Sequence, residues 1–183
     1  MRKALLPLLI CLFGFFALPA IAALDVGDKA PDFSAPASLG GKDFRFSLAE
    51  ALKQGPVVLY FYPAAFTSGC TVEAHNFAAA IDDYKALKAT VIGVSADSID
   101  TLHKFSVSEC RGKFAVAADP EMRIARSYDA VLLWKSGWAS RTSYVITPDG
   151  RIAYAYTAMS PDKHVENTLG ALRAWAASSS RMR

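Results

Sequence analysis

Residues 57–77 read VVLYFYPAAFTSGCTVEAHNF. The first six, Val57 to Tyr62, are aliphatic or aromatic residues of the kind that favours strands, and their number suits a buried strand. Pro63 cannot donate a ladder hydrogen bond, so the strand ends there. A helical pattern then begins near Cys70. The sequence therefore predicts the end of a strand followed directly by the start of a helix, a junction where α/β proteins commonly bind ligands.

Cys70 is expected in the first turn of that helix. Backbone N–H groups in a first turn have no partner within the helix, and together with the helix dipole they stabilise an anion. This position favours a thiolate, the nucleophilic form of cysteine. Apolar residues at helical spacing predict a single helix whose buried face consists of Cys70, Ala74, Phe77, Ile81 and Tyr84. Position alone leaves two interpretations open, a reactive thiolate or a small buried hydrophobe.

The neighbours of Cys70 resemble a known active site. The motif Pro63-x-x-x-Thr67-x-x-Cys70, followed by Thr71 and Glu73, is similar to the signature of the peroxiredoxins, which are thiol peroxidases. The resemblance implies that Cys70 is the peroxidatic cysteine, which attacks a hydroperoxide and becomes a sulfenic acid. It also implies that Thr67 hydrogen-bonds the thiolate or the peroxide and that Pro63 shields the site. From the residues alone, Thr67 as a helix N-cap and Pro63 as a strand terminator remain open.

A second part of the site is expected far along the chain. Two apolar stretches flank Thr147-Pro148-Asp149-Gly150, a strong signal for a β-hairpin, and Arg141 opens the first of them. The resemblance places the guanidinium of Arg141 beside Cys70, where a permanent charge with forked donors stabilises the thiolate and orients the peroxide. It also implies that Glu73 holds this arginine. A surface cation and a first-turn acid are the alternatives from the residues alone.

Cys110 is the other cysteine that concerns function. The pattern predicts a helix capped by Asp97 or Ser98 that reaches about Cys110, with Gly112 ending it. Some Q-type peroxiredoxins, also called bacterioferritin comigratory proteins, have a resolving cysteine in this helix. The more common position, five residues after the peroxidatic cysteine, holds His75 here. Cys110 is therefore a candidate resolving cysteine, and the alternatives are a packing cysteine in a one-cysteine enzyme or a structural disulfide.

The resemblance covers nearly the whole chain after its first residues. The segment GDKAPDF at residues 27–33 is similar to the entry motif of peroxiredoxins, and KHVE at residues 163–166 is similar to the last helix of Q-type members. Alternating strand and helix signals predict parallel strands with crossovers. With the resemblance, the expected fold is α/β and thioredoxin-like. It has a mixed central sheet with a parallel centre and an antiparallel hairpin, and helices on both faces.

The amino terminus is organised like a secretory signal peptide. Met1-Arg2-Lys3 is basic, residues 4–18 are uncharged and mostly apolar, and Ala20-Ile21-Ala22 matches a cleavage site. We expect residues 1–22 to be removed. Export would place the mature protein in the periplasm or outside the cell, and an uncleaved membrane anchor is the alternative.

Length and charge limit the remaining possibilities. A chain of 183 residues is long enough for one sizeable core, and we expect a domain over residues 23–177 and a flexible tail over residues 178–183. The net charge is +3 and falls to about +1 when Arg2 and Lys3 are removed, too little to support a nucleic-acid partner. We expect a monomer or weak homodimer that meets the membrane only through its signal segment.

The resemblance also implies the reaction partners. These are a hydroperoxide substrate and a thioredoxin-like reductant, with no metal or other cofactor. Two other functions remain as alternatives. A copper-binding chaperone of related fold needs a second cysteine where Ala74 stands, and an exported thiol–disulfide oxidoreductase needs one where Glu73 stands.

Overall fold

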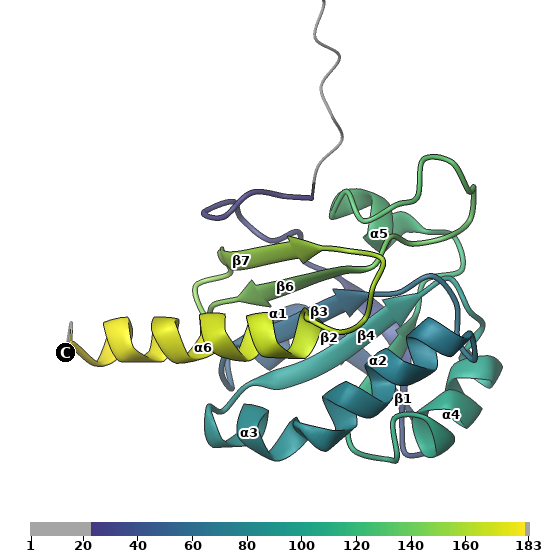
Figure 1. The fold of residues 1–183 in the computed structure, drawn as a ribbon, viewed down its shortest axis with the longest axis horizontal. Coiled ribbons are helices and arrows are strands. Elements are labelled where there is room, and N and C mark those ends of the chain that lie inside the picture. Colours follow the sequence, from purple (N-terminus) through teal and green to yellow (C-terminus); the bar gives the residue numbers. More distant parts are fainter. Residues whose placement is uncertain (1–22, 182–183) are drawn as a thin grey trace, which may run out of the picture.

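The computed structural model describes residues 23–181, which form one seven-stranded sheet flanked by helices (Figure 1). The strand order is β2-β1-β5-β4-β3-β6-β7. The strands are β1 (Ser34–Leu39), β2 (Lys42–Ser47), β3 (Val57–Phe61), β4 (Thr90–Ser95), β5 (Ala115–Ala118), β6 (Thr142–Ile146) and β7 (Ile152–Thr157). The helices are α1 (Leu48–Leu52), α2 (Ser68–Ala79), α3 (Ile81–Ala86), α4 (Ile99–Ser108), α5 (Arg123–Ser127) and α6 (His164–Arg181).

The centre of the sheet is parallel and its two sides are antiparallel. β4 pairs in parallel with both β3 and β5. β3 also pairs antiparallel with β6, whose hairpin partner β7 forms one edge of the sheet. On the other side, β1 pairs antiparallel with β5 and β2. The predicted mixed sheet with a parallel centre and an antiparallel hairpin is confirmed, and the β1–β2 hairpin extends it further.

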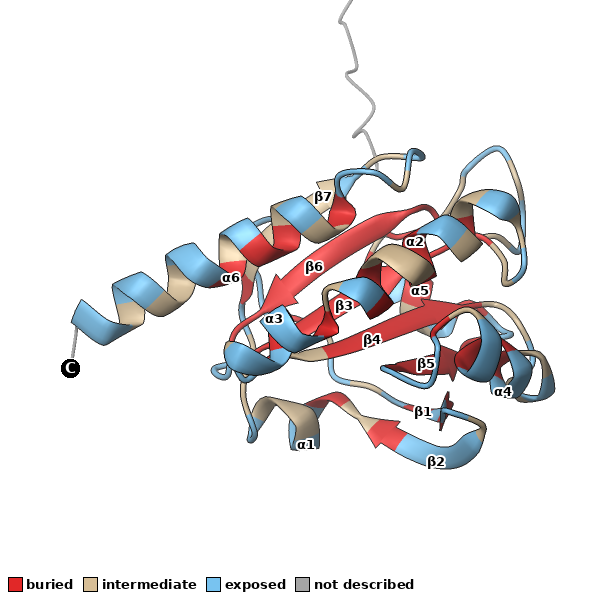
Figure 2. Ribbon diagram, turned by 60° about the horizontal axis from the view of Figure 1, so that its bottom comes forward, coloured by how far each residue is buried: buried red, intermediate tan, exposed pale blue. Residues whose placement is uncertain are grey.

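Helices cover both faces of the sheet because side chains alternate along its strands. In β3, Val57, Leu59 and Phe61 belong to one apolar cluster, whereas Val58 and Tyr60 belong to another. Helices α1 and α5 pack on the first cluster, and α2, α3, α4 and α6 pack on the second. Figure 2 shows the central strands buried between these two layers. The expected arrangement of helices on both faces is confirmed.

The apolar stripe that begins at Cys70 is buried, but it spans two helices and not one. α2 ends at Ala79 and α3 begins at Ile81. Between them Ala80 has φ −93° and ψ 3°, in the bridge region outside helical values. Since neither proline nor glycine stands there, no residue type signals the break in advance.

The last helix is longer than expected. α6 continues to Arg181, whereas the sequence predicts a flexible tail from residue 178. Alanine is the best helix former, and Ala176 and Ala177 carry the helix into the serine run that follows. The domain boundary expected at residue 177 therefore falls within a helix.

The expected signal peptide, residues 1–22, lies outside the described residues, so its removal stays a prediction. From residue 23 to residue 181, no helix combines the length and the apolar character needed to cross a bilayer.

Candidate active site

The loop between β3 and α2 is fixed by Asp97. Its Oδ2 accepts hydrogen bonds from the backbone N–H of Ala65 at 2.7 Å and from the hydroxyl of Ser95 at 2.7 Å. Of the two expected caps of α4, Ser98 is the one whose side chain accepts a backbone N–H in the first turn. Asp97 instead connects the end of β4 to the loop that leads into α2.

Thr67 stands at the N-cap of α2, but its side chain does not cap the helix. The hydroxyl donates to the carbonyl oxygen of Ala64 at 2.9 Å, so its own lone pairs are left to accept a hydrogen bond. Pro63 is buried two residues after β3. Both residues lie at the junction where the motif predicts them, and their catalytic roles stay predictions.

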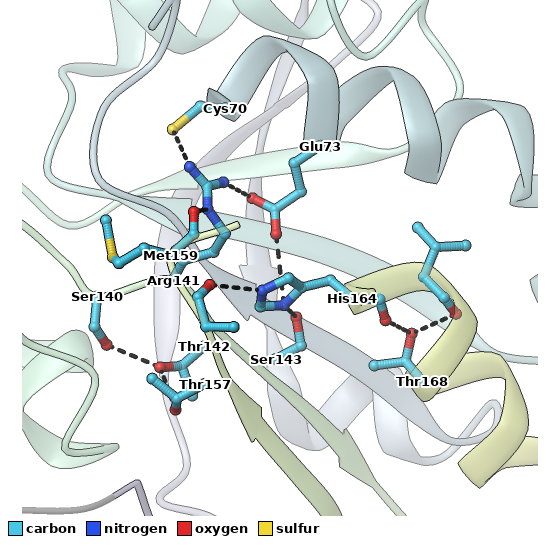
Figure 3. Close-up of polar contacts among 12 residues, drawn as sticks. Cys70, Glu73, Ser140, Arg141, Thr142, Ser143, Thr157, Met159, His164 and Thr168 are labelled. Atoms are coloured by element: carbon cyan, nitrogen blue, oxygen red, sulfur yellow. Dashed lines mark hydrogen bonds and ion pairs between the residues drawn. The ribbon is translucent and has the colours of Figure 1, made fainter. Parts of the chain in front are cut away.

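Cys70 lies in the first turn of α2 beside the guanidinium of Arg141 (Figure 3). Nη2 of Arg141 donates to Sγ of Cys70 at 3.5 Å. Residue 69 is glycine, and a Cβ there would lie 3.0 Å from Nη2, so the missing side chain leaves room for this approach. Cys70 is only 1% exposed.

Arg141 enters the site from the residue before β6 and uses three of its donors. Nε donates to the carbonyl oxygen of Met159 at 2.9 Å, and Nη1 donates to Oε2 of Glu73. Together with the contact to Cys70, these bonds hold the plane of a permanently charged group. The resemblance implies that Cys70, Glu73 and Arg141 come together, and the structure brings them together although Arg141 is 71 positions from Cys70 and 68 from Glu73.

His164 is a further member of this cluster, and no sequence pattern indicates its place there. It is the first residue of α6 and is fully buried. Its Nδ1 lies 2.8 Å from Oγ of Ser143, and its Nε2 lies 3.0 Å from the carbonyl oxygen of Ala158. Nδ1 also lies 3.6 Å from Oε1 of Glu73. The only available signal was the KHVE segment, which does not reveal what a histidine at a helix start contacts.

Burial and charge together govern protonation in the cluster. Burial raises the pKa of the Glu73 carboxyl, and the guanidinium of Arg141 counteracts part of that rise. Burial also lowers the pKa of His164, and the positive charge of Arg141 lowers it further. His164 is therefore a neutral imidazole near pH 7.

Cys110 lies beyond α4, which ends at Ser108 and so is shorter than the sequence predicts. Its thiol is free and fully buried, and it belongs to the same apolar cluster as Cys70. Burial raises the pKa of the Cys110 thiol, and the charge of Glu109 raises it further. A protonated thiol in apolar surroundings is a poor nucleophile. In this conformation Cys110 therefore has the properties of a packing residue.

His75 occupies the position of the commonest resolving cysteine and makes a different contact. Its Nε2 lies 2.9 Å from Oε2 of Glu109, which joins α2 to the segment that carries Cys110. Across residues 23–181, no group of three or more histidine, cysteine or acidic side chains is placed to hold a metal ion.

The sequence profile described as the AhpC/TSA family matches residues 26–155, more than half of the chain. The chain belongs to the AhpC/TSA family. A Mycobacterium tuberculosis protein named peroxiredoxin Rv1608c is 32% identical over 154 residues, covering 82% of this chain and 97% of the relative. Peroxiredoxin Q, chloroplastic, from Oryza sativa subsp. japonica is 30% identical over 148 residues, covering 80% of this chain and 66% of the relative.

Solved structures agree with this family membership. Peroxidoxin BcpB from Mycobacterium tuberculosis has a TM-score of 0.73 and 32% identity, covering 81% of this chain and 96% of that chain. A mutant of Xylella fastidiosa PrxQ, at 24% identity, matches in fold with a TM-score of 0.74 and covers 85% of this chain and 99% of that chain. This AhpC/TSA family member has the thioredoxin-like peroxiredoxin fold and is a thiol-dependent peroxidase. The copper-chaperone and disulfide-oxidoreductase alternatives are not favoured.

Proposed function

We propose that Cys70 is the peroxidatic cysteine of this peroxidase and that Arg141 activates it. The observation that carries the proposal is the 3.5 Å contact between Nη2 of Arg141 and Sγ of Cys70 in a buried site. A cation beside a sulfur in a water-poor environment stabilises the thiolate far more than the same cation in water. The position of Cys70 in the first turn of α2 adds unpaired N–H groups and the positive end of the helix dipole.

The reaction follows from this arrangement. The thiolate attacks one oxygen of the hydroperoxide, an S–O bond forms, and the O–O bond breaks. The departing oxygen keeps the electron pair of that bond and takes up a proton, giving water or an alcohol, while Cys70 becomes a sulfenic acid. Thr67 accepts a hydrogen bond from the peroxide with the lone pairs that its bond to Ala64 leaves available. Arg141 donates to a peroxide oxygen, and Pro63 shields the sulfur from water.

Regeneration of the thiol has two candidate routes. The sulfenic acid can condense with Cys110, releasing water and forming a disulfide, or it can condense with an external thiol. The first route requires the turn after α4 to open, because Cys110 is fully buried. That turn contains two residues with left-handed backbone conformation, Arg111 at φ 53° and Gly112 at φ 63°, so it is already separated from the regular helix. A thioredoxin-like protein then supplies the electrons in either route.

The decisive experiment measures hydroperoxide consumption with a dithiol donor for three proteins: wild type, Cys70→Ser and Cys110→Ser. Removal of a catalytic nucleophile lowers turnover on the order of 10⁴-fold or more, so Cys70→Ser should consume peroxide at the background rate. Activity retained in Cys70→Ser would disprove the proposal. Mass spectrometry of wild type after one equivalent of peroxide separates the two routes. A Cys70–Cys110 disulfide supports the resolving role, and a Cys70 sulfenic acid beside a free Cys110 excludes it.

We also propose that the chain is exported, acts in the periplasm or outside the cell, and is a monomer or weak homodimer. The basic and apolar character of residues 1–22 supports export. The intact mass of the protein from a periplasmic fraction should correspond to a chain that begins at Ala23. A cytoplasmic protein that retains Met1, or a membrane-bound one that retains residues 1–22, would contradict export with cleavage. Light scattering on a dilution series tests the oligomeric state.

A further inference from the structure

One oxygen of Glu73 lacks a hydrogen-bond partner although the side chain is fully buried. Oε2 accepts from Nη1 of Arg141, but Oε1 has no partner among the described residues. Its near neighbour is Nδ1 of His164, at 3.6 Å (Figure 3). Buried carboxylate oxygens are rarely left without a hydrogen bond. The contact between Oε1 of Glu73 and Nδ1 of His164 therefore raises the question of which of the two atoms carries a proton.

The hydrogen bonds of His164 determine which of its nitrogens carries the proton. Nε2 lies 3.0 Å from the carbonyl oxygen of Ala158, and a carbonyl only accepts, so Nε2 carries the hydrogen. In a neutral imidazole Nδ1 is then an acceptor with a single lone pair, which the hydroxyl of Ser143 at 2.8 Å and a proton on Oε1 of Glu73 would share. An ionised Glu73 would place two acceptors against each other in a dry site. A proton on Oε1, directed at Nδ1, removes that conflict.

The charges around the pair lead to the same conclusion. Arg141 contributes one positive charge, and the thiolate of Cys70 contributes one negative charge. The other titratable side chains that face the pair are tyrosines: the ring of Tyr156 from β7 lies against His164, and Tyr60 from β3 lies on the Glu73 side. An ionised Glu73 would leave this buried group with a net negative charge, which a low-dielectric interior opposes. One proton on Glu73 makes it neutral.

We propose that Glu73 is a neutral carboxylic acid, with its proton on Oε1 and held toward Nδ1 of His164, while Cys70 is a thiolate. His164 is then a positioning residue that keeps this proton in place, and the charge of Arg141 serves Cys70 without competition from Glu73. The inference rests on the proposed role of Cys70. The pKa directions are in agreement, because burial raises the pKa of Glu73 and lowers that of His164.

The proton on Glu73 responds to the oxidation state of Cys70. When the thiolate becomes a neutral sulfenic acid, Arg141 loses its anionic partner, and an ionised Glu73 becomes the better partner. Glu73 then releases one proton. Conversion of a thiolate and a hydroperoxide to a neutral sulfenic acid and an alcohol consumes one proton, so the two events balance in number and in charge.

The first test is infrared spectroscopy of the reduced protein at pH 7. Wild type should show the carbonyl stretch of a protonated carboxylic acid, and the band should disappear in Glu73→Gln and after one equivalent of peroxide. Glu109→Gln is the matched control, since Glu109 already pairs with His75, and it should retain the band. Absence of the band in wild type, or a band unaffected by peroxide, would overturn the proposal. This outcome is distinct from failure of the proposed function, which Cys70→Ser reports.

The second test compares His164→Asn with His164→Leu. Asparagine retains a polar acceptor near the position of Nδ1, and leucine does not. In His164→Leu the proton on Glu73 loses its acceptor, so the pH at which the reaction with peroxide is half-maximal should rise by about one unit. In His164→Asn most of that shift should be absent, because the amide retains an acceptor. Equal rate losses in both variants with an unchanged pH profile would reduce His164 to a structural role and disprove the inference.

Discussion

Cys70 and Cys110 are both almost completely buried, and they belong to the same apolar cluster. Their local charges are opposite. Cys70 lies in the first turn of α2, at the positive end of the helix dipole, with a guanidinium 3.5 Å away. Cys110 lies beyond the negative end of α4, next to Glu109, and burial raises the pKa of its thiol. The two buried sulfurs therefore differ in the sign of the neighbouring charge, which favours a thiolate at Cys70 and opposes one at Cys110.

Among variants that keep both cysteines, the largest effect is expected when the cation beside Cys70 is changed and its charge is kept. Arg141→Lys retains one positive charge, but an ammonium cannot donate to Met159, Glu73 and Cys70 at once from a fixed plane. We expect the rate of Cys70 oxidation by peroxide to fall about 10²- to 10³-fold, the usual loss when a transition-state donor is removed. Stopped-flow measurement of the reaction checks this. A rate within threefold of wild type would show that charge alone distinguishes the two cysteines.

Thr67 offers a second way to weaken the site around Cys70. Thr67→Val keeps the shape of the side chain and removes the hydroxyl, so the peroxide loses an acceptor and the loop loses its bond to Ala64. We expect a rate loss of about 10- to 100-fold, in the lower range for a lost polar contact at a reacting centre. Thr67→Ser is the control and should keep most of the rate. Equal losses in both variants would assign the effect to packing.

A smaller effect is expected from Gly69→Ala, which alters the distance between the cation and the sulfur. The new Cβ would lie 3.0 Å from Nη2 of Arg141, so the guanidinium must move by a few tenths of an ångström away from its position. We expect about a tenfold lower rate with peroxide. Gly170→Ala in α6 is the matched control, because its Cβ would meet no atom within 4 Å, and its rate should not change. Equal rates for Gly69→Ala and wild type would mean that Arg141 tolerates displacement.

The smallest effect concerns Cys110 and stability. Because its folded pKa is raised, Cys110 contributes stability that is fully present below the unfolded pKa, about 8.5, and that is lost as the pH rises above it. Wild type should lose about 0.8 kcal/mol of unfolding free energy from this group by pH 9. Denaturant titrations of wild type and Cys110→Ala at pH 7 and pH 9 check this. The loss should be smaller in Cys110→Ala, and identical losses would place the pH dependence elsewhere.

The sequence was informative where local patterns and the family resemblance pointed to the same residues. The strand at β3, the start of α2, the β6–β7 hairpin and the contacts among Cys70, Glu73 and Arg141 were all predictable. The strand and hairpin followed from apolar runs and turn residues, which act over a few positions. The contact of Arg141 with Cys70 required the resemblance, because no local pattern relates residues 71 positions apart.

Other features depended on tertiary contacts that no pattern reports. The break at Ala80 contains neither glycine nor proline, and Asp97 holds a distant loop in addition to preceding a helix. The position of His164 beside Glu73 depends on where α6 begins relative to α2. The tail predicted from residue 178 is helical for a different reason. The helix preference of the alanines before it outweighs that of the serine run.

The pairing of β3 with β6 places Tyr60 opposite Ser143 and Phe61 opposite Thr142. Since strand side chains alternate, this alignment turns Arg141 and Ser143 toward the layer that contains α2 and α6. A shift of a single residue would direct the guanidinium to the opposite layer, against α1 and α5, with every amino acid unchanged. The register between these two strands is therefore as much a part of the enzyme as its cysteine.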